Sequence, residues 1–353
     1  MRMQWDVFCR VIDNFGDIGV CWRLAADLAA RGESVRLWVD DAGALAWMVP
    51  DGATGVTVLN WRDAAVDAPI GDVVVEAFGC ELPTEVVARM ARRTPVPVPV
   101  WINLEYLSAE AYAQRSHGLP SPQSSGPGVG LTKWFFYPGF GAGTGGLIRE
   151  ADLLQRQRDF DTTAWLASIG CARQPQEGVV SLFCYRNPRL PELLEALSTE
   201  PTLLLVAAGE ATRQVAAELG PTLRHGALRA HLLPLLTQVD YDHVLWASDI
   251  NFVRGEDSFV RAQWAGKPFV WQIYPQQDGA HALKLQAFCA LFAGATNGLD
   301  LWRCWSAWNG LTTQALQQPP TDAWRAASRA WRDRLLAQPD LASQLRGFVA
   351  ERR

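Results

Sequence analysis

Two short segments carry residue types from which a reactive site could be built. The first, residues 13–19, reads Asp-Asn-Phe-Gly-Asp-Ile-Gly and follows an apolar run. Asp13 and Asp17 flank Gly16, which lets the backbone pass close to a substrate. The glycines do not follow a dinucleotide-binding spacing, and two carboxylates would repel a pyrophosphate. They suit proton abstraction or a cationic acceptor, although Asp17 could instead simply stabilise the start of a helix.

The second segment, residues 251–259, reads Asn-Phe-Val-Arg-Gly-Glu-Asp-Ser-Phe. Arg254 ends an expected strand, and a helix is expected to start near Ser258. The first turn of a helix offers N–H groups and a partial positive charge, to which Arg254 adds a fixed cation. Together they predict a site for a diphosphate leaving group. An ordinary helix capped by Asp257 or Ser258 would not account for Arg254 and Glu256.

A pair of aromatic residues follows another expected strand. Phe183 and Tyr185 are two positions apart, so both side chains lie on one face and could stack on a base. Aromatic residues buried in a sheet would give the same pattern, and this alternative stays open.

Signals for a metal site are weak. The pairs Asp159/Asp161 and Asp240/Asp242 have the D-x-D spacing of metal-dependent transferases, but the first lies in a polar helical stretch and the second in an expected turn before a strand. The five histidines show no zinc-binding spacing. No metal ion and no cofactor is therefore expected.

The elements that must position these residues alternate between strand and helix. In the first hundred residues an expected helix at Ile18–Ala30 follows the first of five short apolar runs, which are Trp5–Val11, Val35–Val39, Val56–Leu59, Val73–Ala77 and Val98–Leu104. Continuous apolar strands joined by helices predict a parallel sheet covered on both faces, as in a Rossmann-like domain.

A second alternating series begins near Gly178. Its expected strands are Val179–Tyr185, Leu203–Ala207, Arg229–Leu233, Leu245–Ala247, Asn251–Val253 and Phe269–Ile273. Helices are expected at Pro191–Leu197, at Phe259–Ala265 and through most of the chain after Ala280. The predicted fold class is α/β and GT-B-like, with two Rossmann-like domains facing a cleft and a helical C-terminal tail.

The chain is expected to divide into four segments. Residues 1–150 form the N-terminal, acceptor-binding domain and residues 151–177 linker helices; residues 178–320 form the C-terminal, nucleotide-sugar-binding domain, and residues 321–353 the final helices. Within the first domain, Leu107–Gly146 reads as a mobile lid, an acceptor-facing loop or a plain surface loop around an expected strand at Leu131–Tyr137.

The composition limits the classes of binding partner and the location that are expected for this protein. The net charge of −5 over 353 residues is mildly acidic, whereas binding of nucleic acid requires a basic face, so no nucleic-acid partner is expected. No apolar run approaches a membrane span, and no signal peptide is visible, so a cytoplasmic protein is expected. The seven scattered cysteines suggest buried, reduced thiols. Five of the sixteen tryptophans are expected to pack helices near the C-terminus: Trp302, Trp305, Trp308, Trp324 and Trp331.

Three of these features together resemble a known family. Residues 11–20, the Phe183/Tyr185 pair and residues 254–258 are similar to the bacterial protein-arginine rhamnosyltransferases of the EarP family, and the likeness extends over nearly the whole chain. The resemblance implies a GT-B fold and inverting transfer of rhamnose from dTDP-β-L-rhamnose to one arginine of translation elongation factor P. It also implies that the donor lies mainly against the C-terminal domain and the acceptor on the N-terminal one.

The resemblance further implies roles for individual residues. Asp17 would be the general base, with Asp13 and Glu256 also required for activity. The donor-binding residues it implies are Phe15, Gly16, Phe183, Tyr185, Gln238, Arg254, Asp257 and Ser258. Two alternatives remain open: a GT-B transferase with a glycan, lipid or small-molecule acceptor, and a non-catalytic nucleotide-sugar-binding protein.

Overall fold

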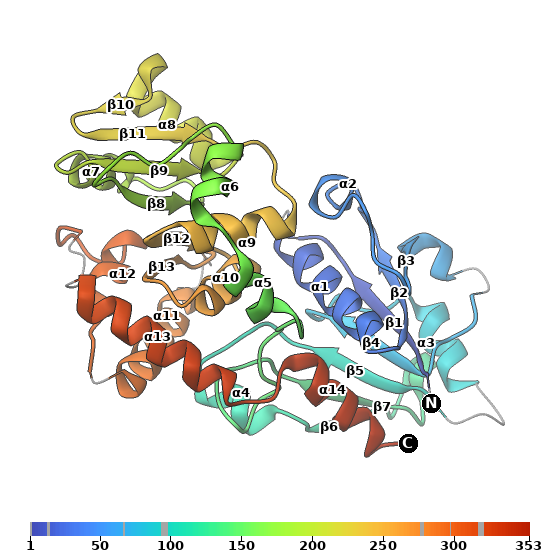
Figure 1. The fold of residues 1–353 in the computed structure, drawn as a ribbon. Coiled ribbons are helices and arrows are strands. Elements are labelled where there is room, and N and C mark those ends of the chain that lie inside the picture. The colour runs from blue at the N-terminus through green and yellow to red at the C-terminus, as the bar shows by residue number, and fades with distance from the viewer. Residues whose placement is uncertain are drawn as a thin grey trace. The chain divides into compact units, whose positions relative to one another are not determined.

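The chain forms two compact units. The computed structural model describes residues 2–12, 15–65, 68–92, 98–275, 279–296, 298–316 and 321–353. Unit 1 comprises Met1–Ala151 together with Gln338–Arg353, and unit 2 comprises Asp152–Ala337 (Figure 1). The segment 321–353, expected as one helical tail, is therefore divided between the units, and the expected linker 151–177 belongs almost wholly to unit 2.

Unit 1 contains a seven-stranded sheet in the order β3-β2-β1-β4-β5-β7-β6. The strands are β1 (Gln4–Cys9), β2 (Ser34–Val39), β3 (Val56–Asn60), β4 (Val73–Ala77), β5 (Val100–Leu104), β6 (Pro120–Pro122) and β7 (Thr132–Phe136). All neighbours are parallel except β6, which pairs antiparallel with β7. The predicted parallel sheet is confirmed, and the short antiparallel edge strand is an addition.

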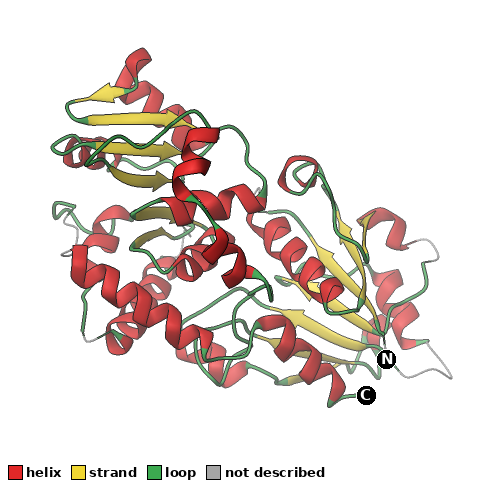
Figure 2. Ribbon diagram, in the orientation of Figure 1, coloured by secondary structure: helices red, strands yellow, loops and turns green. Residues whose placement is uncertain are grey.

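Helices cover both faces of this sheet. They are α1 (Gly16–Ala30), α2 (Leu45–Met48), α3 (Thr84–Ala91), α4 (Ala111–Ser116) and α14 (Leu341–Ala350), with 3-10 turns η1 (Trp61–Ala65) and η2 (Gly126–Gly128). Consecutive strand residues point to opposite faces: Val7 joins the core formed with α1 and α14, while Phe8 joins the core formed with α3. Figure 2 shows these layers.

Unit 2 contains a six-stranded sheet in the order β10-β11-β9-β8-β12-β13. Its strands are β8 (Gly178–Leu182), β9 (Thr202–Val206), β10 (Arg224–His225), β11 (Leu228–Leu232), β12 (Ile250–Arg254) and β13 (Phe269–Gln272). Only β10 pairs antiparallel among them. Its helices are α5 (Leu153–Asp159), α6 (Thr162–Ser168), α7 (Leu190–Leu197), α8 (Glu210–Leu219), α9 (Gln238–Ala247), α10 (Asp257–Ala265), α11 (Ala280–Ala295), α12 (Trp302–Trp308) and α13 (Thr321–Leu336), with the turn η3 (Gly220–Thr222).

One predicted strand is wrong. Leu245–Ala247 forms the last turn of α9, and these residues are buried against neighbouring elements. A short apolar run looks the same in a buried helix as in a buried strand. The helix begins upstream, where the Thr237 side chain accepts a hydrogen bond from the backbone N–H of Asp240 at 3.0 Å. Asp240 therefore lies in a helix and not in the turn that was expected.

The two D-x-D pairs have structural roles. Asp161 caps α6 by accepting hydrogen bonds from two backbone N–H groups at its start. Asp242 forms a fully buried ion pair with Arg261, with an N–O distance of 2.6 Å. A buried carboxylate must be paired in this way because removing its charge from water is costly. Neither pair points to a metal ion.

The C-terminal tryptophans pack as expected. Trp305, Trp308, Trp324 and Trp331 are at most 1% exposed, and Trp302 is half-buried.

All seven cysteines are free and buried. Burial raises the pKa of Cys184 to about 12, so that side chain stays a neutral thiol. Within the part of the chain that is described, no helix is both long and apolar enough to cross a bilayer.

The glycine-rich segment 139–146 is a packed part of unit 1 and does not have the open structure of a lid. A side chain at Gly145 would come within 2.2 Å of the Phe136 ring, and one at Gly146 within 2.5 Å of the carbonyl oxygen of Pro339. Thr144 is also buried. These glycines are present because neighbouring groups approach the backbone closely. The expected strand within 131–137 is confirmed as β7.

Replacing Gly145 by alanine is expected to destabilise the protein by about 1–3 kcal/mol, because the new methyl group would overlap the Phe136 ring. Gly141→Ala is the matched control, since nothing lies within 4 Å of its added carbon. Urea unfolding of both variants measures the difference. Equal midpoints for the two variants would contradict the close packing described here.

Candidate active site

The topology of unit 1 marks one edge of its sheet as a binding site. From β1 the chain adds β2 and β3 on one side and then returns to add β4, β5 and β7 on the other. Parallel sheets bind ligands beyond the carboxyl ends of their strands, at the point where the order in which strands are added changes from one side to the other. In unit 1 that point lies between β1 and β4, which pair directly.

Asp17 lies beside this point, in the first turn of α1. It is 3% exposed, and its Oδ2 accepts a hydrogen bond of 2.9 Å from the backbone N–H of Ile12. The Tyr106 hydroxyl donates to its other oxygen, Oδ1, at 3.3 Å. Asp17 is not the helix cap, because Phe15 occupies that position without a side-chain bond. Its carboxylate instead holds the turn that follows β1.

The other residues expected in this turn have different surroundings. Phe15 is 36% exposed and packs edge-on against Trp47, with ring centroids 5.0 Å apart. Gly16 is the first residue of α1. Asp13, together with Asn14, lies outside the described residues.

The structure brings further side chains to the same edge that the sequence did not single out. Phe78 directly follows β4 and stacks on Tyr106, with centroids 4.4 Å apart and planes at 14°. Glu105 directly follows β5 and accepts a 2.6 Å hydrogen bond from the Asn103 side chain. The sequence signal that could have identified Phe78 and Glu105 is their position directly after two predicted strands. Carboxylates beside aromatic faces suit a planar cation such as a guanidinium group.

Unit 2 has an equivalent reversal point. From β8 the chain adds β9 and β11 on one side and then β12 and β13 on the other. The reversal lies between β8 and β12, which pair directly. Phe183 and Tyr185 follow β8, and Arg254 is the last residue of β12. Topology alone therefore places three predicted site residues at the ligand-binding edge.

The Arg254 side chain lies against both aromatic residues. Its guanidinium carbon is 4.3 Å from the ring centroid of Phe183 and 4.4 Å from that of Tyr185. Both rings are half-buried, so they do not belong to the buried core of the sheet. The backbone N–H of Tyr185 is held in turn by the Gln272 side chain at 2.8 Å. The cation is thus oriented by the two residues expected to stack on the nucleotide.

The start of α10 adjoins this arginine. The N-cap residue is Glu256, and its side chain makes no cap bond. The alternative of an ordinary helix capped by Asp257 or Ser258 is therefore wrong. The Ser258 hydroxyl accepts a 3.1 Å bond from the N–H of Arg254 and donates to its carbonyl oxygen. Burial raises the pKa of Tyr241, whose hydroxyl also bonds Ser258. Ser258 therefore ties the strand end to the helix start.

Gln238 belongs to the same edge of unit 2. It is the first residue of α9, on the segment that follows β11, and it is 7% exposed. Its helix packs against α10. Among the described residues, no three His, Cys, Asp or Glu side chains gather closely enough to hold a metal ion.

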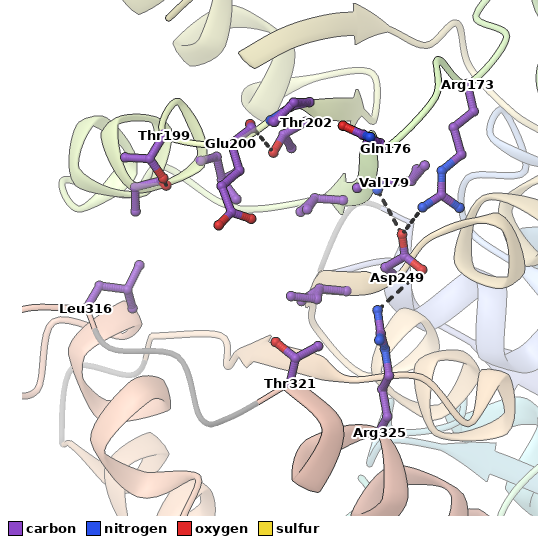
Figure 3. Close-up of a pocket in the computed structure, with 16 residues that line it drawn as sticks. Arg173, Gln176, Val179, Thr199, Glu200, Thr202, Asp249, Leu316, Thr321 and Arg325 are labelled. Carbon is purple, nitrogen blue, oxygen red and sulfur yellow. Dashed lines mark hydrogen bonds and ion pairs between the residues drawn. The ribbon is translucent and has the colours of Figure 1, made fainter. Parts of the chain in front are cut away.

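A cavity of about 530 Å³ lies at the opposite, amino edge of the unit 2 sheet (Figure 3). Val179, Thr202 and Ile250 contribute to its wall from the starts of β8, β9 and β12. Asp249 carries ion pairs to Arg173 at 3.0 Å and to Arg325 at 3.8 Å within the lining. No predicted site residue falls there, and parallel sheets bind their ligands at the other edge.

Comparison with solved structures identifies the fold. The chain is similar over 99% of its length to the glycosyltransferase VinC in complex with dTDP, at a TM-score of 0.54 and 12% identity, covering 100% of that chain. It is similar to the plant glycosyltransferase UGT89C1 complexed with UDP-L-rhamnose at a TM-score of 0.52 and 11% identity, covering 99% of each chain. At such identities the likeness establishes the fold, which is that of the GT-B glycosyltransferases.

Closer relatives define the family. A family model described as "Elongation-Factor P (EF-P) rhamnosyltransferase EarP" matches residues 5–350. The chain is 43% identical to the protein-arginine rhamnosyltransferase of Pseudomonas aeruginosa over 99% of both chains, and 35% identical to that of Neisseria meningitidis over 98% of this chain and 96% of the relative. It also matches a structure named "Structural basis for EarP-mediated arginine glycosylation of translation elongation factor EF-P", at 33% identity, 99% coverage of both chains and a TM-score of 0.66. The chain therefore belongs to the EarP family of protein-arginine rhamnosyltransferases.

Proposed function

We propose that this enzyme transfers L-rhamnose from dTDP-β-L-rhamnose to an arginine of translation elongation factor P, with inversion at the anomeric carbon and without a metal ion. The names of its relatives support the acceptor and the sugar. The observation that carries the mechanism is the opposite charge of the two ligand-binding edges: a buried carboxylate, Asp17, in unit 1 and an oriented cation, Arg254, in unit 2.

The acceptor nitrogen sets the main chemical difficulty. The pKa of a free guanidinium group lies far above 7, so at pH 7 only about one group in a million is neutral, and neutralising it costs roughly 8 kcal/mol. A carboxylate that accepts the proton while the carbon–nitrogen bond forms avoids a separate neutral intermediate. Asp17 is the proposed base, because its carboxylate is held in place by Ile12 and Tyr106. Asp13 is proposed to assist it.

The leaving group sets the second requirement. As the bond between the anomeric carbon and the phosphate oxygen breaks, negative charge grows on dTDP. Arg254 supplies a charge-assisted hydrogen bond, and the first turn of α10 adds its partial positive charge. Such groups stabilise developing charge best when they are already oriented. The two rings in contact with Arg254 provide that orientation.

The remaining residues are proposed to bind the donor. Phe183 and Tyr185 hold the thymine or its sugar on the ring surface left by Arg254, and Gln238 and Ser258 bind nucleotide and diphosphate. Asp257 has a carboxylate that can accept bonds from sugar hydroxyl groups. Glu256 is proposed to be needed for turnover, and Phe15 and Gly16 are proposed to contact the donor. Because the proposed acceptor is a translation factor, the enzyme is proposed to act in the cytoplasm.

The proposal is tested by incubating the enzyme with purified elongation factor P and dTDP-β-L-rhamnose. Mass spectrometry is expected to show the gain of one deoxyhexose on an arginine peptide, and NMR an α-linked product. Addition of EDTA should leave the rate unchanged, with UDP-glucose as the negative donor control. Donor binding without any modified peptide would favour a non-catalytic binding protein, and modification of a glycan alone would favour the other acceptor class.

A further inference from the structure

We propose that Tyr106 has two functions toward the acceptor: its hydroxyl positions the carboxylate of Asp17, and its ring, backed by Phe78, is the platform on which the acceptor guanidinium stacks. The inference rests on the proposed role of Asp17 as base. It assigns a positioning residue and an acceptor-binding surface. Phe78 and Tyr106 lie outside the two segments, residues 13–19 and 251–259, that the sequence analysis identified.

The Tyr106 hydroxyl contributes one of the hydrogen bonds that orient Asp17. The backbone N–H of Ile12 binds Oδ2 at 2.9 Å, and the Tyr106 hydroxyl binds Oδ1 at 3.3 Å. Because the two donors engage different oxygens, they fix the plane of the carboxylate as well as its position. The longer bond exceeds the usual O–H···O range of about 2.5–3.0 Å, and bonds of this kind tighten when substrate binds. A fixed carboxylate meets the transferred proton without reorganisation.

The ring offers a surface suited to a planar cation. Phe78 covers one side of Tyr106 in a nearly parallel stack, with planes at 14°. Tyr106 nevertheless stays 37% exposed, so part of its surface is open to solvent. Guanidinium groups stack on aromatic faces, and their delocalised charge is attracted by the ring. The hydroxyl of the same side chain binds the carboxylate that would take the proton.

The backbone supports a functional role for this stack. Phe78 has a φ of 57°, in the left-handed region that non-glycine residues seldom occupy. Strained residues of this kind persist where the surrounding structure holds them, and they cluster at ligand-binding sites. In this conformation the Phe78 ring stacks on that of Tyr106. Glu105, the neighbour of Tyr106, adds a second carboxylate to the same loop.

Two substitutions separate the hydroxyl from the ring. Tyr106→Phe removes the hydroxyl and keeps the stack, so kcat should fall about 5- to 20-fold while the KM for elongation factor P stays within about twofold. Tyr106→Leu also removes the aromatic face, so its kcat should fall as far and its KM should rise about 3- to 30-fold. Calorimetry should give an unchanged Kd for the nucleotide sugar in both variants.

Tyr112→Phe is the matched control. Tyr112 is also 37% exposed and packs edge-on against Tyr137, but it belongs to α4 and not to the Asp17 site. Its loss of a hydroxyl should leave kcat and KM unchanged. Thermal melting of each variant shows whether a kinetic change comes from unfolding. If Tyr106→Leu is unstable, Phe78→Leu tests the platform instead, with the hydroxyl intact and an increased KM as the expected result.

The outcomes distinguish this inference from the proposed function. Wild-type kcat in Tyr106→Phe would refute the positioning role of the hydroxyl, and an unchanged KM in Tyr106→Leu or Phe78→Leu would refute the platform. If Asp17→Asn is inactive in the same assay, those results would overturn only the role of Tyr106. If Asp17→Asn is itself fully active, the base assignment fails and this inference fails with it.

Discussion

Replacing Asp17 by asparagine is expected to lower kcat for arginine rhamnosylation by about 10²- to 10⁴-fold, the range for loss of a general base. Asparagine has nearly the same shape and can still accept one hydrogen bond, so the buried turn should survive. It cannot accept a proton from the guanidinium group. The Kd for dTDP-β-L-rhamnose should stay within about twofold, since the proposed nucleotide contacts belong mainly to unit 2. Single-turnover kinetics and calorimetry measure the two effects separately.

Asp40→Asn is the matched control for this variant. Asp40 follows β2 and accepts a 2.9 Å bond from the backbone N–H of Val11, next to the Ile12 group that Asp17 holds. Both carboxylates therefore support the same turn, but Asp40 is exposed and makes no contact with Tyr106 among the described interactions. Its replacement should change kcat by no more than about twofold. Comparable losses in the two variants would show that Asp17 acts by holding the turn and not as a base.

Replacing Arg254 by alanine is expected to weaken binding of dTDP and of the sugar donor by about 10- to 100-fold, as expected for the loss of a charge-assisted hydrogen bond to phosphate. The kcat should fall as well, by about 10²- to 10³-fold, because the same cation stabilises charge on the departing diphosphate. This combination differs from that of Asp17→Asn, which should change kcat alone. Calorimetry with dTDP and saturating kinetics with donor give the two values.

Two further variants make the Arg254 result specific. Arg254→Lys keeps a positive charge but loses the planar fork that lies against Phe183 and Tyr185, so its donor affinity should lie between those of wild type and alanine. Arg213→Ala removes an exposed arginine that pairs with Glu210 on α8, and it should leave affinity unchanged. An unchanged Kd in Arg254→Ala would exclude the diphosphate role. Equal losses in Arg213→Ala would point to a general effect of charge.

Much of the fold could be predicted because its determinants are local. Mainly apolar runs such as Val73–Ala77 and Leu203–Ala207 predict strands that are buried on both faces, and these correspond to β4 and β9. Helical periodicity predicted a helix at Ile18–Ala30, which ends at the last residue of α1. Alternation of the two patterns was sufficient to predict two parallel sheets and hence the GT-B class.

Local sequence was insufficient to predict an element where the same pattern of residues is typical of both a strand and a helix. Leu245–Ala247 is equally apolar in a strand and in a buried helix, and only its packing in unit 2 makes it the end of α9. The short strands β6 and β10 have too few residues to show alternation. The return of α14 to unit 1 depends on Leu341, Leu345 and Val349 entering a core formed by distant residues.

For the candidate site, the sequence by itself determined which chemical groups are available and the strand ends that carry them. It identified Asp17, which follows a strand, and Arg254, which ends one, because both lie within distinctive motifs. Only the tertiary structure decided what surrounds them: Tyr106 bonds Asp17, and Phe183 with Tyr185 encloses Arg254. The physical reason is that secondary structure follows from contacts between near neighbours. The orientation of a side chain at a sheet edge is set by residues that the order of the strands brings together.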